Sequence, residues 1–552
     1  MTMPRYIVYF VTMGDKVCLG LSPDPVFDWR YWQSLGCASF PRQLAPPLPL
    51  FAAQKLLASL TKRPFIPNKI SFFGRLALAW RARKFTPQPA PESRAVADDL
   101  LRRLLAGRIY LWEELERLWR EDDLSLAVQK LVLEGKCLLT AAVGLDSWGR
   151  LVCRRCGGSN LEPNRWCCPG QICVECTECS ALGKASTCKG LVAMAREGDD
   201  PPRRVRLQLP FALTKAQSTA SRQLAEFVRS EKSTLLLWAV CGAGKTEVSF
   251  QAAQIVLAQG GRVLLAVPRR SVVRELAGRL EGAFPNLSLQ VLYGGVDREQ
   301  RRRSSPLVLA TTHQVLRFYR NFDLVILDEA DAFPYRGSRM LQQAAERALR
   351  PGGKRIFMTA TPDRALLKKV RAENWSLARL PVRHHGRPLP VPAVLLSALK
   401  EEPLELPEQV LAQIQSSRSL FIFVPTVALC LKVAQHLRQR MGEVESCHAQ
   451  DPERDKKLAA FRRGEVRYLV STTVAERGIT IPGVDVLVLF ANHQLFDERA
   501  LVQMAGRAGR TAAQPTGEVC FAAVSQSTAM TEAIRQIREQ NLEAARLGLI
   551  AA

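Results

Sequence analysis

The stretch "LLLWAVCGAGKTE", residues 235–247, decides the fold of the chain around it. An apolar run turns there into a glycine-rich loop, and a segment that suits a helix follows the loop directly. A strand that ends in such a loop points backbone N–H groups, and the positive end of the next helix, at a phosphate chain. The sequence therefore predicts an α/β domain that binds the phosphates of a nucleotide.

The residues of this loop have separate expected roles. We expect Lys245 to pair with the β- and γ-phosphates of ATP and Thr246 to hold Mg²⁺. Gly242, Ala243 and Gly244 form the turn around the phosphates, and the two glycines leave room because they lack a Cβ atom. A chance glycine-rich turn is the alternative for a motif that stands alone, but further motifs follow along the chain.

Two adjacent carboxylates end a second apolar run, "FDLVILDEADAFP", at residues 322–334. Asp328 is placed to hold Mg²⁺ through water, Glu329 to orient and deprotonate the attacking water, and Asp331 completes the tetrad. A solvated turn or a helix cap is the alternative interpretation of such acidic residues. The separation of about eighty residues from the phosphate loop suits a single RecA-like domain and favours the catalytic interpretation.

A second α/β domain is indicated by the alternation of elements further along the chain. Residues 419–426, "SLFIFVPT", suit a strand, a helix-like segment follows, and residues 466–490 contain two more strands. Each half should therefore be a mostly parallel sheet with helices on both faces.

The segment "QMAGRAGR", residues 503–510, ends the series. Gln503, Arg507 and Arg510 are three or four residues apart and would share one face if the segment is helical. The planar, permanently charged arginine side chain suits a γ-phosphate whose charge grows in the transition state. These arginines would complete the site only when the two domains close, although an arginine-rich surface helix is the alternative for the octapeptide alone.

Cysteines gather upstream of the phosphate loop. Cys153 and Cys156 form one C-x-x-C pair, and the nineteen residues before Cys176 and Cys179 match the spacing of a Cys₄ zinc site. Four thiolates around Zn²⁺ would give a small segment the fold that its own core cannot supply. The ligand set stays open, because Cys173 with Cys176 is an equally suitable pair. The eight cysteines of the region could also form two sites, which would draw in Cys167 or Cys168 and Cys188.

Composition limits the class of partner. Lys and Arg outnumber Asp and Glu by 77 to 52, and the formal net charge of +25 favours a polyanion, either nucleic acid or an anionic membrane surface. A generic basic surface is the alternative. No run of about 18 uncharged apolar residues is present, so we expect no membrane-spanning helix and a cytoplasmic protein.

The ordered motifs "AVCGAGKTE", "VPRRSVVREL", "LATTHQVLRF", "LDEADAFPY", "MTATP", "VSTTVAERGIT" and "QMAGRAGR" resemble a superfamily-2 helicase core over about residues 205–525. With a cysteine-rich segment directly upstream, the chain most resembles the ComFA family of late-competence DNA translocases. The resemblance implies that Gln217 reads adenine and that Arg477 and Gly478 link the strand-binding groove to ATP. The residues that it places in that groove are Arg269, Thr312, Thr473 and Thr480.

The expected fold class is α/β, with two RecA-like doubly wound parallel-sheet domains preceded by a zinc module and an N-terminal α+β region. The expected boundaries are 1–150 for the N-terminal region of uncertain role, 151–200 for the zinc module, 205–385 for the ATP-binding domain and 386–552 for the second RecA-like domain.

The expected activity is that of an ATP-dependent single-stranded DNA translocase that helps to draw transforming DNA into the cytoplasm, with ATP, Mg²⁺ and Zn²⁺ as cofactors. The resemblance implies as partners single-stranded DNA and competence proteins, among them a membrane DNA-uptake channel and a small phosphoribosyltransferase-like protein, which would hold it at the inner face of the membrane. Self-association stays open. The alternatives are a primosome-type replication-restart helicase and a zinc-dependent DNA-binding scaffold with a switch ATPase.

Overall fold

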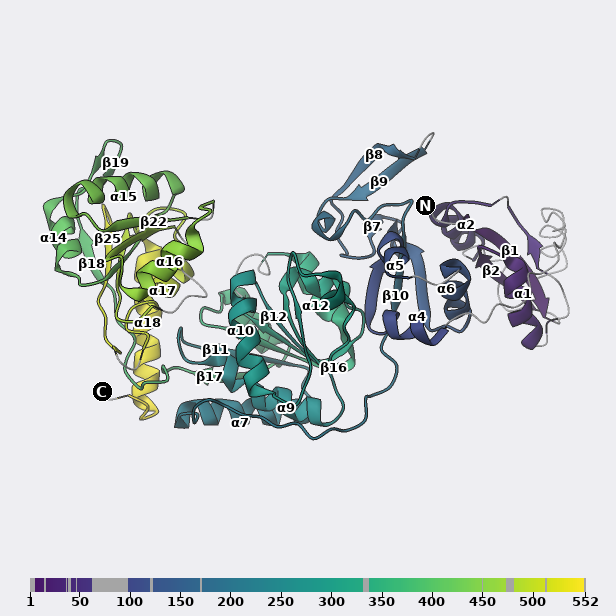
Figure 1. Cartoon of the computed structure of the whole chain (residues 1–552), viewed down its shortest axis with the longest axis horizontal. Helices are drawn as coiled ribbons and strands as arrows, with labels where there is room; N and C mark the ends of the chain where they lie inside the picture. Colours follow the sequence, from purple (N-terminus) through teal and green to yellow (C-terminus); the bar gives the residue numbers. More distant parts are fainter. Residues whose placement is uncertain are drawn as a thin grey trace.

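The computed structural model describes residues 5–13, 16–35, 37, 41–45, 47–61, 98–119, 123–168, 171–330, 337–448, 450–472, 481–511 and 514–550. Thr473 and Thr480 of the expected strand-binding groove lie outside the described residues, as do Asp331, Arg477 and Gly478. Within the described ranges, the second RecA-like domain lies at one end of the molecule, the first in the middle and the N-terminal region at the other end (Figure 1).

Seven parallel strands form the sheet of the first RecA-like domain, in the order β13-β14-β12-β15-β16-β11-β17. Most of these strands are nearly continuous apolar runs with few exposed residues, as expected for strands that helices cover on both faces. In chain order they are β11 (Thr234–Ala239), β12 (Val263–Val267), β13 (Leu289–Leu292), β14 (Leu307–Thr311), β15 (Phe322–Asp328), β16 (Leu349–Thr359) and β17 (Ser376–Leu380).

Six parallel strands form the second sheet, in the order β18-β25-β24-β21-β23-β22. They are β18 (Ala393–Leu396), β21 (Leu420–Phe423), β22 (Val444–Cys447), β23 (Tyr468–Ser471), β24 (Asp485–Leu489) and β25 (Val519–Ala523). A separate two-stranded sheet joins β19 (Lys400–Glu401) to β20 (Leu404–Glu405). The two parallel sheets confirm the predicted pair of RecA-like domains.

Helices connect and cover the strands of both sheets. Those of the first domain are α7 (Lys215–Arg229), α8 (Lys245–Val248), α9 (Phe250–Ala258), α10 (Arg270–Ala283), α11 (Arg298–Arg302), α12 (Arg339–Ala348) and α13 (Arg364–Ala372), with the short helix η2 (Thr312–Arg317). Those of the second are α14 (Glu408–Ser416), α15 (Val427–Met441), α16 (Arg454–Arg463), α17 (Glu498–Ala505) and α18 (Thr528–Arg546).

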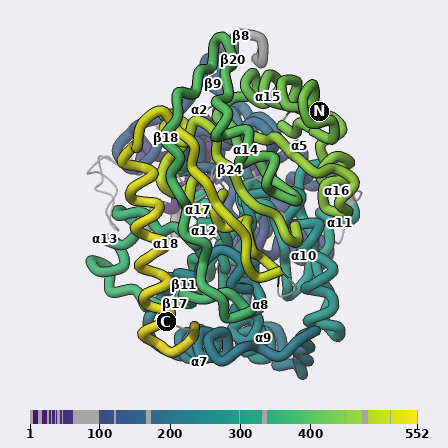
Figure 2. Tube along the Cα trace, turned by 90° about the vertical axis from the view of Figure 1, so that its left-hand side faces the viewer, coloured from purple at the N-terminus to yellow at the C-terminus, as the bar shows by residue number. Residues whose placement is uncertain are grey.

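The last helix, α18, joins the second domain to the first. Figure 2 shows it beside β17, the strand at one edge of the first sheet. Arg379 of β17 forms an ion pair of 2.8 Å with Glu543 of α18, and the side chain of Asn541 bonds both backbone groups of Leu389 in the connection between the domains. The orientation of the two domains is therefore set partly by contacts outside the ATP motifs.

The N-terminal region is α+β, as predicted. A small sheet, ordered β2-β1-β3, is followed by a helical unit in which β10 pairs antiparallel with β5. The elements are β1 (Ile7–Met13), β2 (Lys16–Ser22), α1 (Pro25–Ser34), β3 (Arg42–Gln43), α2 (Leu50–Thr61), α4 (Asp98–Leu105), β4 (Arg108–Leu111), α5 (Trp112–Leu118), α6 (Leu124–Leu133), β5 (Cys137–Ala141) and β10 (Gly190–Met194).

The cysteine-rich module lies between the paired strands β5 and β10. It consists of the hairpin of β6 (Val143–Leu145) with β7 (Leu151–Cys153), the longer hairpin of β8 (Leu161–Cys168) with β9 (Gln171–Cys176), and the short helix η1 (Ser180–Leu182). Because β6 and β7 pair across the expected boundary at residue 150, strand pairing does not stop there. The module is an insertion into the unit that contains β5 and β10.

The cysteine-rich module also packs directly on the first RecA-like domain. Buried cysteines of the module share one hydrophobic core with residues of β15, β16 and α12. Arg347 of α12 donates hydrogen bonds to the backbone carbonyls of Arg154 and Arg155, beside the first C-x-x-C pair. The module is therefore attached to the ATP-binding domain through α12.

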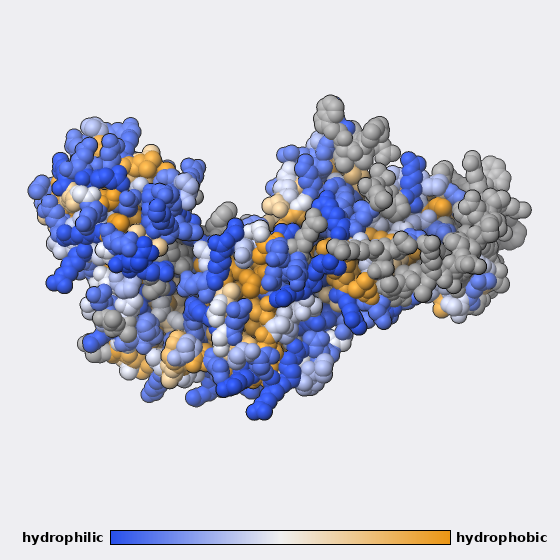
Figure 3. Space-filling view, viewed as in Figure 1, coloured by the Kyte–Doolittle hydropathy of each residue, from blue (hydrophilic) through white to orange (hydrophobic). Residues whose placement is uncertain are grey.

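Hydrophilic residues cover most of the second domain on the face shown in Figure 3, and the outline has a broad notch between this domain and the cysteine-rich module. Among the described residues, no helix is both long and apolar enough to cross a membrane.

Candidate active site

The phosphate loop follows β11, as the sequence predicted. Gly242 and Gly244 have φ angles of 82° and 77°, in the left-handed region that favours glycine. A Cβ atom at Gly244 would also lie only 2.6 Å from Nε2 of Gln217. The positive φ therefore favours glycine at the residue before α8, where Lys245 begins the helix, and a Cβ atom there would displace the amide of Gln217.

The structure brings Lys245, Thr246 and Asp328 together. Nζ of Lys245 lies 2.9 Å from Oδ1 of Asp328, and Oγ1 of Thr246 lies 3.5 Å from Oδ2 of the same carboxylate. Burial raises the pKa of Asp328, and the ammonium of Lys245 acts in the opposite direction. A hydroxyl and a carboxylate at this position are oxygen donors of the kind that Mg²⁺ prefers.

Glu329 follows on the same strand end in an unusual backbone conformation. Its φ of 51° is uncommon for a residue with a side chain, and its N–H donates a 2.7 Å hydrogen bond to Oδ1 of Asp328. This local turn holds the two carboxylates in adjacent but different positions. The arrangement would allow Asp328 to bind the metal while Glu329 activates a water molecule.

Gln217 lies in the first turn of α7 and is buried. Its Oε1 accepts a 3.0 Å hydrogen bond from the N–H of Thr214, and its Nε2 donates a 2.8 Å bond to the carbonyl of Ala243 in the phosphate loop. The side chain therefore supports the phosphate loop from behind. Its expected contact with adenine stays a prediction.

Residues of the second domain lie against the phosphate loop. The thiol of Cys241 donates a 3.1 Å hydrogen bond to Oε1 of Gln503, and a Cβ atom at Gly242 would lie 3.4 Å from Cγ of Arg510. Helix α17 ends at Ala505, so Arg507 and Arg510 lie beyond it in a turn instead of on one continued helical face. Arg507 is buried in this turn.

The residues expected to bind the DNA strand have different environments. Arg269 is the residue before α10 and lines a hollow of about 460 Å³ together with Arg270, Ser271, Arg274, Arg454 and Asp455. This hollow spans the two RecA-like domains, because α10 belongs to the first and α16 to the second. Thr312 is buried instead, and its hydroxyl has no hydrogen-bond partner within the described part of the chain.

Arg270, Arg274 and Arg454 also line this hollow, and the sequence alone did not predict them as functional residues. The guanidinium carbons of Arg270 and Arg274 lie 4.8 and 5.5 Å from the centre of the Tyr293 ring. Their spacing of four residues at the start of α10 places them on one face, a signal that was present in the sequence. Nothing in the sequence brings Arg454 to the same hollow, because it comes from the other domain.

Four buried cysteines form a cluster in the inserted module. The sulfur atoms of Cys153, Cys156, Cys176 and Cys179 all lie within 4.8 Å of one another, with 3.5 Å between Cys156 and Cys176 and 3.7 Å between Cys153 and Cys179. Tetrahedral Zn²⁺ with Zn–S bonds of about 2.3 Å separates its sulfur ligands by about 3.8 Å. The donor set and the spacing therefore fit zinc.

The other cysteines of the module are arranged differently. Cys173 accepts a 3.5 Å hydrogen bond from Thr187, and Cys188 lies 3.2 Å from the hydroxyl of Ser186. Neither belongs to the four-sulfur cluster. The side chains of Cys167 and Cys168 lie outside the described part of the structure.

Arg155 is not one of the four cluster residues, but its side chain contacts the cluster directly. Its Nε and Nη2 atoms donate to the sulfur of Cys179 at 3.3 and 3.0 Å. Hydrogen bonds from the neighbouring thiols lower the pKa of Cys179, and the charge of Arg155 adds to this effect. At Cys179 the surroundings thus favour the thiolate form that a metal binds, whereas contacts with the neighbouring thiols raise the pKa of Cys156.

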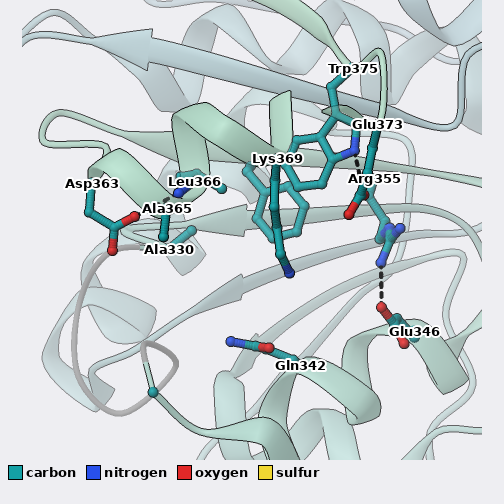
Figure 4. A pocket seen from close by; sticks show the side chains of 12 residues that line it. Ala330, Gln342, Glu346, Arg355, Asp363, Ala365, Leu366, Lys369, Glu373 and Trp375 are labelled. Atoms are coloured by element: carbon teal, nitrogen blue, oxygen red, sulfur yellow. Dashed lines mark hydrogen bonds and ion pairs between the residues drawn. The ribbon is translucent and has the colours of Figure 1, made fainter. Parts of the chain in front are cut away.

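A separate pocket of about 390 Å³ lies between α12 and α13 (Figure 4). The ring of Trp375 stacks on Phe357 at 5.2 Å, and Arg355 forms a 3.0 Å ion pair with Glu346 of α12. Ala330 and Asp363 place one end of this pocket beside the ATP motifs. Helix α12 therefore separates this pocket from the cysteine-rich module.

These features define an ATP-hydrolysing enzyme of the superfamily-2 helicase class. Residues 210–364 match the family described as type III restriction enzyme, res subunit, and residues 402–512 match the helicase conserved C-terminal domain. The class implies ATP and Mg²⁺ as cofactors.

The chain belongs to the ComFA family of competence proteins. It is 36% identical to the competence protein ComFA of Bacillus subtilis over 406 residues, and this alignment covers 72% of this chain and 87% of the relative. It is also 36% identical over 409 residues to ComFA of Streptococcus pneumoniae, covering 72% of this chain and 91% of the relative. A solved structure of S. cerevisiae Dbp5 bound to RNA and ADP BeF3 matches with a TM-score of 0.46 and 19% identity, over 59% of this chain and 87% of that one.

Proposed function

We propose that this enzyme is an ATP-dependent single-stranded DNA translocase that acts in DNA uptake during natural transformation. One observation carries the proposal: the second domain supplies both Arg510 beside the phosphate loop and Arg454 in the arginine-lined hollow. A relative motion of the domains would therefore change the ATP site and the strand-binding surface together. Membership of a competence-protein family supplies the biological setting.

The proposed hydrolysis uses the two domains in turn. With ATP bound, Lys245 would move from Asp328 to the β- and γ-phosphates. Thr246 and Asp328 would hold Mg²⁺, which would neutralise phosphate charge. Glu329 accepts the proton of the attacking water. Arg507 and Arg510 approach the γ-phosphate as the domains close, and Gln503 helps to hold their turn on the phosphate loop. Closure is then the step that couples hydrolysis to movement along DNA.

The arginine-lined hollow supports binding of a single strand. Arg269, Arg270, Arg274 and Arg454 would contact phosphates, and the ring of Tyr293 is held beneath two of them. Such contacts are independent of sequence and depend strongly on salt. Thr312 would contribute only if its buried hydroxyl becomes accessible on binding, and Thr473 and Thr480 are assigned to the groove by the family resemblance alone.

Zinc would have a structural role at Cys153, Cys156, Cys176 and Cys179. Four thiolates around one ion would fix the β6–β7 and β8–β9 hairpins against α12 of the ATP-binding domain. We further propose that the protein works at the cytoplasmic face of the membrane with a DNA-uptake channel and a small phosphoribosyltransferase-like competence protein. These partners follow from family membership alone.

Steady-state ATPase rates on oligodeoxynucleotides of increasing length test the proposal. At saturating DNA, a motor that takes many steps hydrolyses more ATP per binding event on a longer strand, so the rate should rise with length and then level off. Single strands should stimulate the rate more than blunt duplex. A rate that is independent of DNA, or that is the same from the shortest bound oligonucleotide onward, would favour a static switch instead of a translocase.

A further inference from the structure

The connection between the two RecA-like domains, residues 381–392, contains a buried arginine. Arg383 is 1% exposed, and its guanidinium donates four hydrogen bonds, all of them to backbone carbonyls. Nε donates to Cys241 at 3.2 Å, Nη1 donates to Ala508 at 2.7 Å and to Gly509 at 2.6 Å, and Nη2 donates to Gly506 at 3.2 Å. One side chain therefore bonds two separate parts of the active site.

The two parts are the phosphate loop and the arginine turn, residues 506–510, which carries Arg507 and Arg510. Cys241 directly precedes Gly242 of the phosphate loop, whereas the other three acceptors lie between Gln503 and Arg510. Since Arg383 itself lies in the connection between the domains, three segments that are remote in sequence meet at one guanidinium. The planar arginine fork can reach several acceptors at fixed angles, which a point charge cannot do.

No described carboxylate forms an ion pair with Arg383. Burial lowers its pKa to about 10, so the side chain still carries its charge at neutral pH. Removing a charge from water is unfavourable unless the protein replaces the lost hydrogen bonds. The carbonyls of the phosphate loop and of the arginine turn supply that replacement, which ties the position of this side chain to both.

The two residues that follow repeat the pattern. Nδ1 of His384 lies 3.3 Å from the carbonyl oxygen of Gly242 in the phosphate loop, and Nε2 of His385 lies 3.1 Å from the carbonyl oxygen of Gly509 in the arginine turn. The turn also fits closely, because a Cβ atom at Gly506 would lie 2.6 Å from Cβ of Cys241. The connection thus joins both parts through three consecutive residues.

We propose that Arg383 is a positioning residue for ATP hydrolysis, which fixes the turn bearing Arg507 and Arg510 in register with the phosphate loop. The connection between the domains then sets where the arginines meet the γ-phosphate when the domains close. This inference rests on the proposed role of Arg510 and extends it to a residue outside the seven motif stretches of the helicase core.

The test compares Arg383→Lys with three other variants of the full chain. Arg383→Lys keeps the positive charge but cannot serve all four carbonyls, so the DNA-stimulated kcat should fall about tenfold or more while KM for ATP changes less than about threefold. His385→Ala, which removes one interaction from the same set, should lower kcat by a smaller factor. Arg387→Ala is the matched control, because Arg387 is an exposed arginine of the same connection, and it should behave as wild type.

The fourth variant, Arg510→Ala, separates this inference from the proposed function. If Arg510→Ala leaves kcat unchanged, the proposed arginine role fails, and the inference that rests on it fails too. If Arg510→Ala lowers kcat but Arg383→Lys matches Arg387→Ala, only the inference is overturned. It is also overturned if Arg383→Lys loses thermal stability and nucleotide binding in proportion to kcat, because Arg383 would then act on the fold alone.

Discussion

Lys245 and Thr246 contact the same carboxylate, so a change at the phosphate loop alters the charge environment of Asp328 as well. We predict that Lys245→Ala abolishes hydrolysis and weakens ATP binding. The reason is that the variant loses a phosphate contact and also the ammonium that opposes the raised pKa of Asp328. Isothermal titration with ATP and a phosphate-release assay measure the two effects.

Glu329→Gln should behave differently, because it keeps the size of the side chain and removes only the base. The variant should bind ATP with about wild-type affinity and lower kcat by about 10²-fold or more. Normal turnover in purified Glu329→Gln protein would show that another group activates the water.

The sequence predicted that Lys245, Thr246 and Asp328 would meet at one site. Strand, loop and helix are local features of the sequence, and parallel strands of one sheet end at the same edge. Arg383 could not be predicted, since its four acceptors are set by contacts between remote segments. The cysteine cluster shows the same limit. Cys173 and Cys176 have the right spacing in sequence, but an odd separation on strand β9 directs them to opposite faces.

Among the elements, α12 connects the cysteine-rich module to the ATP-binding domain. Arg347 of this helix bonds the carbonyls of Arg154 and Arg155, and Gln343 lies so close to Gly157 that a Cβ atom there would clash with it. A loss of zinc should therefore change the stability of α12, although this helix contributes no ligand.

We predict that Cys153→Ala combined with Cys156→Ala lowers bound zinc by about one ion per chain and increases amide exchange in α12, because zinc at the four thiolates would hold the hairpins in place. Metal analysis and hydrogen exchange measure the two changes. Cys173→Ala with Cys188→Ala is the matched control and should keep its zinc. Full zinc occupancy in the first double variant would assign the metal to other ligands.

A buried carboxylate links elements of the N-terminal region. Asp28 of α1 accepts hydrogen bonds from Tyr9 at 2.6 Å, Ser22 at 2.7 Å and Gln129 of α6 at 3.0 Å. Burial raises its pKa from 3.8 to about 7, against the opposing effect of these bonds. The folded state therefore binds a proton more tightly than the unfolded state does.

This shift gives a pH dependence of defined sign. The contribution of Asp28 to stability should be complete below about pH 4 and should be lost as the pH rises through 7. Amide protection of β1 and β2, compared at pH 6 and pH 8 after correction for intrinsic exchange, should fall in the wild type. Asp28→Asn does not titrate and should remove the fall; an equal fall in the variant would trace the effect to another group.

For the whole molecule, the net charge of +25 indicates the kind of partner only when the positions of the basic side chains are known. Composition left nucleic acid and a membrane surface as alternatives, whereas the structure gathers Arg269, Arg270, Arg274 and Arg454 in one hollow between the domains. The sequence could place each arginine on its own element but not the two elements side by side.

We predict that Arg270→Ala with Arg274→Ala weakens single-stranded DNA binding and reduces the slope of log K against log salt by about 1 to 2, as expected for the loss of two phosphate contacts. Fluorescence anisotropy at several salt concentrations measures the slope. Arg463→Ala with Arg535→Ala is the matched control, because both arginines are exposed and already paired with glutamates. Equal slopes in the two double variants would place the strand elsewhere.

The insertion of the cysteine-rich module between β5 and β10 has a consequence for biosynthesis. Strand β5 leaves the ribosome before its partner β10, and the antiparallel pair can form only after the residues between them have been synthesised. A metal-closed module shortens the effective loop between the two strands and so lowers the entropy cost of their pairing. We therefore expect zinc supply during translation to determine whether β5 pairs with β10 and whether the module then packs on α12 of the ATP-binding domain.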